Sequence, residues 1–174
     1  PHEWGKFIAA VGENLAGGRM KVEMIKSSGP AYDDVENRLM SLKLVSQGLT
    51  TDVMFNAEGE CVQPAEVFYK KTIIVERGNF RPVTYATNDM LDGAREAVLR
   101  QSGCQEEDLV VVMEMTLENL LSEGQLNHAD FPARVDILGA LGRKVLVPKS
   151  GEYDRLAAYH SRYPTKTLPP AVGV

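Results

Sequence analysis

Two short apolar runs, separated by a helical pattern, constrain the fold of this chain most. The runs at 109–113 (Leu-Val-Val-Val-Met) and 144–148 (Lys-Val-Leu-Val-Pro) have the length and β-branched content of buried strands. Between them, apolar residues recur at helical spacing over 131–141, and Gly142 is placed to end that helix. The order strand, helix, strand predicts parallel strands joined by a helical crossover. A further helix is predicted to begin at Ser150.

The amino-terminal half carries helical stripes and one hairpin signal. Apolar residues at helical spacing predict a first helix over 4–15 and a second over 32–45, with Gly48 just beyond its end. Two β-compatible runs around a turn at 56–59 predict a β-hairpin over 51–63, which Pro64 ends. We therefore predict a helical region at 1–50 and an α/β region at 51–174, as one domain or part of one.

A third strand and a third helix are predicted before the first apolar run. The strand covers 72–76, and the helix begins after Thr87 or Asn88 as the N-cap and ends at Gly103. The chain has no initial Met, and its last residues, 169–174, read as the start of a strand that is cut short. We expect the chain to be a segment of a larger α/β or barrel-like protein.

Composition excludes several classes of protein. The chain has 174 residues, a net charge of −5 and no basic block, which argues against a nucleic-acid surface. No apolar run approaches the roughly 20 residues of a membrane span, and no signal peptide is evident. Cys61 and Cys104 are far apart and belong to no CxxC motif, which is typical of reduced thiols in a cytoplasmic protein.

The carboxyl ends of the predicted parallel strands hold the candidate site residues. Ligands of α/β proteins bind at this edge of the sheet, a rule that nominates Glu114, Thr116, Lys149 and Ser150. Glu76 and Arg77 join them if the strand at 72–76 runs in the same direction.

Glu114 is the candidate catalytic residue. It follows an apolar run, so we expect it to be partly buried. A buried carboxylate needs a cation, a metal or hydrogen-bond donors around it, or else it takes up a proton, and Lys149 is placed to be its partner. The alternative is a structural ion pair at the sheet edge. Lys149, Ser150 and Gly151 also precede a predicted helix, whose N-terminus would suit an anion, although Ser and Gly begin many helices for capping alone.

Motifs with a specific chemistry are absent. The chain has no GxGxxG or GxxxxGK[ST] phosphate loop and no GxSxG nucleophile motif. His128 and Asp130 would give a metal only two ligands, so we predict no metal site. The residues indicate no particular cofactor, and they do not decide whether the protein is an enzyme.

Four phrases in the chain resemble a family of large, uncharacterised bacterial proteins. They are Val-Gln-Pro-Ala-Glu at 62–66, Val-Glu-Arg-Gly-Asn-Phe-Arg-Pro-Val-Thr at 75–84, Glu-Met-Thr-Leu at 114–117 and Arg-Val-Asp-Ile-Leu-Gly-Ala-Leu-Gly at 134–142. Members of that family often carry the automatic label nicotinate-nucleotide adenylyltransferase. That activity uses an HxGH loop, and none of His2, His128 and His160 lies in one. The family tends to have Ser-Asn and an aromatic residue after the second parallel strand, where this chain has Lys149, Ser150 and Gly151.

Two functions follow as hypotheses. The first is binding of a small anionic or nucleotide-like metabolite at the strand ends, near Glu114, Thr116, Lys149 and Ser150. The alternative is a non-enzymatic interaction or scaffold module, which would expose an apolar patch and bind a partner or a second copy of the chain. We expect neither nucleic acid nor a membrane as a partner.

Overall fold

The computed structural model describes residues 6, 8–11, 13, 22–29, 36–122 and 129–149. From residue 37 onward, this part of the chain combines helices with five strands. The elements are α2 (Asn37–Ser46), β1 (Asp52–Phe55), β2 (Cys61–Val62), α3 (Pro64–Phe68), β3 (Thr72–Arg77), α4 (Tyr85–Ser102), the 3-10 helix η2 (Glu106–Asp108), β4 (Leu109–Glu114), α5 (Leu117–Ser122), α6 (Asp130–Ala140) and β5 (Lys144–Pro148).

The strands form one open five-stranded sheet in the order β2-β1-β5-β4-β3. β3, β4 and β5 are parallel neighbours, which confirms the predicted β-α-β units. β1 pairs antiparallel with both β2 and β5, so the predicted hairpin is confirmed and its first strand also extends the parallel sheet. The result is a mixed α/β sheet with β2 and β3 at its edges. Membership in a larger or barrel-like protein stays a prediction.

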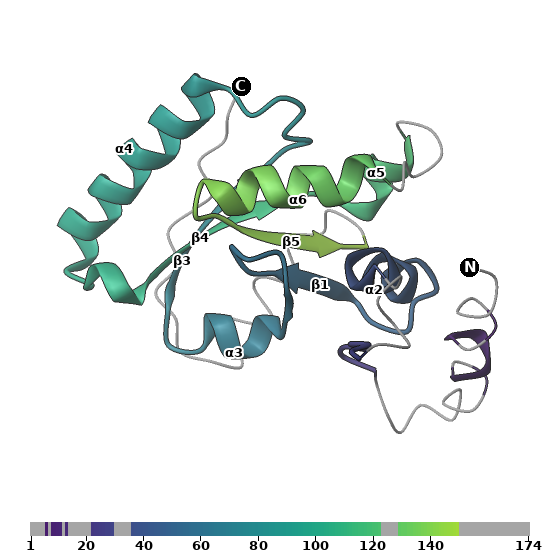
Figure 1. The fold of residues 1–174 in the computed structure, drawn as a ribbon. Coiled ribbons are helices and arrows are strands. Elements are labelled where there is room, and N and C mark those ends of the chain that lie inside the picture. Colours follow the sequence, from purple (N-terminus) through teal and green to yellow (C-terminus); the bar gives the residue numbers. More distant parts are fainter. Residues whose placement is uncertain are drawn as a thin grey trace.

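The two faces of the sheet are covered by different helices. The larger core cluster combines Ile74, Met113 and Val145 of the sheet with apolar residues of α2, α4, α5 and α6. The smaller cluster lies on the other face, where Phe68 of α3 packs with residues such as Val112. Figure 1 shows α6 and α3 on opposite sides of the strands. Successive side chains along each strand therefore point alternately into the larger and the smaller cluster.

Two helices end at the predicted glycines, whereas the start of α4 and the presence of α3 differ from the prediction. Gly103 and Gly142 have φ of +63° and +71°, left-handed values that glycine adopts without strain, and they end their helices as predicted. The N-cap of α4 is Thr84 and not Thr87 or Asn88, because the Thr84 side chain accepts a hydrogen bond from the backbone N–H of Thr87. Pro64 ends the hairpin but also begins α3, a helix that the apolar pattern did not reveal.

The elements predicted near the ends of the chain lie partly or wholly outside the described residues. Residues 6, 8–11 and 13 are helical, in agreement with the first predicted helix, while the rest of its stripe lies outside the described residues. The helix predicted from Ser150 and the strand predicted at 169–174 also lie outside them. Within the described ranges, no helix is long and apolar enough to cross a membrane.

Candidate functional site

Arg77 and Glu114 form an ion pair at the carboxyl ends of β3 and β4. They are directly paired in the register of the two parallel strands, so their side chains leave the same face of the sheet. Arg77 Nε donates to Glu114 Oε1 over 2.6 Å. The Glu114 side chain is only 2% exposed, whereas that of Arg77 is 31% exposed. The pair thus joins a buried carboxylate to a guanidinium that partly reaches the surface.

Burial explains why Glu114 needs this partner. It shares its face of β4 with Val110 and Val112, which belong to the smaller apolar cluster. An ionised carboxylate in such surroundings is costly unless a cation and hydrogen bonds replace the lost water. The expected burial of Glu114 is confirmed. The bond also holds the Arg77 guanidinium in one orientation, and a guanidinium is well suited to bind a carboxylate or phosphate.

Lys149 is not the partner of Glu114, contrary to the sequence hypothesis. Its backbone N–H donates to the carbonyl of Thr51 over 3.2 Å. Its ammonium lies beside the C-terminal end of α2, where a β-carbon at Gly48 would be 3.8 Å from Nζ. A cation there interacts favourably with the negative end of the helix dipole. The backbone hydrogen bond to Thr51, just before β1, therefore holds Lys149 near α2, on the side of β5 away from β4.

Thr116, another predicted site residue, has a structural role at the start of α5. Thr116 is buried, and its Oγ1 accepts a hydrogen bond from the Asn119 N–H over 3.1 Å at the start of α5. The Thr116 hydroxyl therefore acts as a cap for the first turn of α5. Ser150 and Gly151 lie outside the described residues.

Glu76 is buried beside the pair, on the opposite face of β3. It is 8% exposed, and its register partner on β4 is Met113 of the large core cluster. Its Oε2 is buried and accepts no hydrogen bond from any described residue. Loss of hydration raises the pKa of this carboxyl above its ordinary value. The sequence predicted Glu76 as a site residue only because it lies at a strand end. It did not predict that the carboxyl would be buried with an oxygen that lacks a hydrogen-bond partner among the described residues.

An ion-pair network ties loop 78–82 to the start of α6 at the same edge of the sheet. Arg134 is 6% exposed, donates to Asp130 Oδ2 over 2.7 Å and reaches the carbonyl of Asn79 over 3.1 Å. Asp130 also pairs with Arg81 at 3.6 Å. Asp130 is the first residue of α6, after the N-cap Ala129, and it is the centre of this network. The network fixes the loop that follows Arg77.

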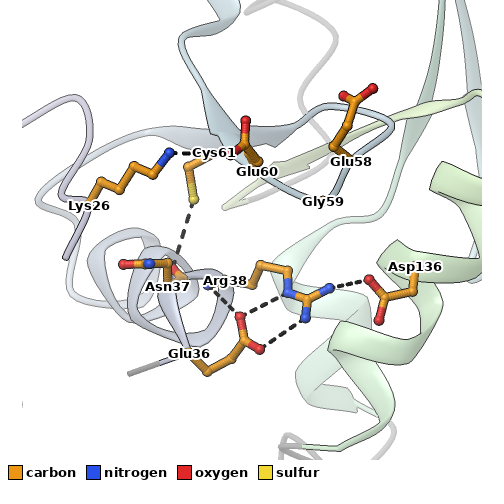
Figure 2. A pocket seen from close by; sticks show the side chains of 9 residues that line it. All are labelled: Lys26, Glu36, Asn37, Arg38, Glu58, Gly59, Glu60, Cys61 and Asp136. Atoms are coloured by element: carbon orange, nitrogen blue, oxygen red, sulfur yellow. Dashed lines mark hydrogen bonds and ion pairs between the residues drawn. The ribbon is translucent and has the colours of Figure 1, made fainter. Parts of the chain in front are cut away.

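A polar pocket opens at the other end of the sheet. Its volume is about 250 Å³, and it lies between the start of α2, the β1–β2 turn and α6 (Figure 2). Its lining residues carry carboxylates, two cations, an amide and a thiol; they are Lys26, Glu36, Asn37, Arg38, Glu58, Gly59, Glu60, Cys61 and Asp136. They come from four separated segments with no shared motif, so no sequence pattern could have found them.

Arg38 occupies the centre of this pocket and is fully engaged in structural contacts. Figure 2 shows its guanidinium between the carboxylates of Glu36 and Asp136, at 2.8 Å and 2.5 Å. It also donates to the carbonyl of Pro132 over 3.2 Å. The hydrogen bonds to Glu36 are the main reason that the pKa of Arg38 is raised. Arg38 thus connects α2 to α6.

Cys61 shows no sign of activation in this pocket. Its Sγ lies 3.0 Å from Ser41 Oγ, and Figure 2 shows it turned toward α2. Burial raises the pKa of the thiol above its ordinary value, and a thiol that stays protonated at neutral pH is a poor nucleophile. Nothing in the described part of the chain groups three or more metal-ligating side chains.

Comparisons of the chain with protein-family models, with curated proteins and with solved structures find no match. The resemblance to the family of large bacterial proteins therefore stays a prediction.

Proposed function

We propose that this domain binds a small anionic or nucleotide-like metabolite beyond the carboxyl ends of β3 and β4. The observation that supports the proposal is the Arg77–Glu114 pair. Glu114 is buried and holds the Arg77 guanidinium by a 2.6 Å bond, while Arg77 itself is 31% exposed at the strand end. Ligands of parallel α/β sheets collect at this edge, and an oriented guanidinium recognises carboxylate or phosphate by paired hydrogen bonds.

The surrounding charges favour a ligand of low charge. Glu114 neutralises Arg77 within the pair, and Asp130 pairs with both Arg81 and Arg134. The nearby cations therefore already have carboxylate partners, unlike the clustered cations that hold a triphosphate. A monophosphate or a carboxylate matches this balance better than a polyphosphate does.

Binding of simple anions tests this proposal. Calorimetry and thermal unfolding with inorganic phosphate, AMP and ATP should show saturable binding of phosphate or AMP by the unmodified chain. Arg77→Lys keeps the charge but removes the guanidinium fork, so affinity should fall at least tenfold. Arg95→Lys is the matched control, because Arg95 lies on α4 in an exposed pair with Glu106. Equal binding by the Arg77→Lys variant and the unmodified chain would contradict the proposal, as would the absence of binding by all three anions.

An interaction module is the second candidate, and one observation favours it. Ile137 and Leu141, one turn apart at the end of α6, are 56% and 44% exposed. Apolar residues at this spacing on an exposed helix face suit contact with another protein surface. Sedimentation across a range of concentrations tests self-association, which Ile137→Lys should abolish. A monomer at every concentration would count against a homo-oligomer formed through this face.

A further inference from the structure

We draw no further inference here: the strongest candidate, the polar pocket of about 250 Å³ between the start of α2, the β1–β2 turn and α6, is a carboxylate-rich cluster whose central Arg38 is already paired with Glu36 and Asp136, and nothing else among the described residues there indicates a ligand.

Discussion

Arg77 and Glu114 face each other across two parallel strands, with Nε and Oε1 2.6 Å apart, and this pair gives the first prediction. Arg77→Met leaves a carboxylate that is 2% exposed without its cation. Because the arginine is partly exposed, we expect a loss of about 2–3 kcal/mol in the free energy of unfolding, measured in urea. The double variant Arg77→Met/Glu114→Leu should recover most of that loss. If Arg77→Met alone unfolds at the same urea concentration as the unmodified chain, the pair contributes no stability.

The contact between α6 and the β1–β2 turn leaves no room for a side chain at Gly139. A β-carbon there would overlap the carbonyl oxygen of Ala57, which belongs to the backbone and cannot rotate away. Gly139→Ala should therefore lower the free energy of unfolding by about 1–3 kcal/mol. Gly93→Ala is the matched control, since nothing lies within 4 Å of its β-carbon position in α4. Alanine is the better helix former, so Gly93→Ala should stabilise the protein by about 0.5–1 kcal/mol. Equal effects of the two substitutions would contradict this account.

Arg38 should matter far more to stability than the exposed Arg95. The Arg38 side chain is 17% exposed and binds Glu36, Asp136 and the Pro132 carbonyl. Arg38→Met should cost about 2 kcal/mol at neutral pH, as expected for several hydrogen bonds to charged groups. Arg95→Met removes an exposed pair with Glu106 and should change stability by less than about 0.5 kcal/mol.

The Arg38 contribution should also depend on pH. The side-chain hydrogen bond from Arg38 lowers the pKa of Glu36 below its ordinary value of 4.5. A lowered folded-state pKa contributes stability above pH 4.5, and that part is lost as the pH falls through the folded value. The difference between the unmodified chain and Arg38→Met should therefore shrink in acid. A constant difference between pH 7 and pH 3 would contradict this linkage.

Glu76 should give the opposite pH dependence. Its folded-state pKa is raised above 4.5 by burial, so its favourable contribution is fully present below pH 4.5 and is lost as the pH rises through the folded value. Glu76→Gln removes this titration, and the variant should gain stability over the unmodified chain at neutral pH but not at pH 4. Thermal unfolding across this range measures the change. Glu96→Gln, at an exposed position of α4, should show no such trend.

Local patterns in the sequence were sufficient to place most of the strands and helices. β-Branched apolar runs predicted β4 and β5, and the turn before Gly59 predicted the β1–β2 hairpin. Gly103 and Gly142 marked the ends of their helices, because the left-handed backbone that ends a helix there is easy only for glycine. α3 was missed, since a proline after a strand is compatible both with a loop and with the first turn of a helix.

The sequence by itself therefore determined where most of the strands and longer helices lie, and it predicted that Glu114 would be at least partly buried at a strand end. Only the tertiary structure decided its partner, because the register of β3 on β4 brings Arg77 to Glu114 while β1 holds Lys149 beside α2. The same packing left Oε2 of Glu76 buried without a hydrogen-bond partner among the described residues. Helix and strand patterns arise from neighbours in the chain, whereas the environment of a buried charge depends on segments that are distant in sequence and meet only when the sheet assembles.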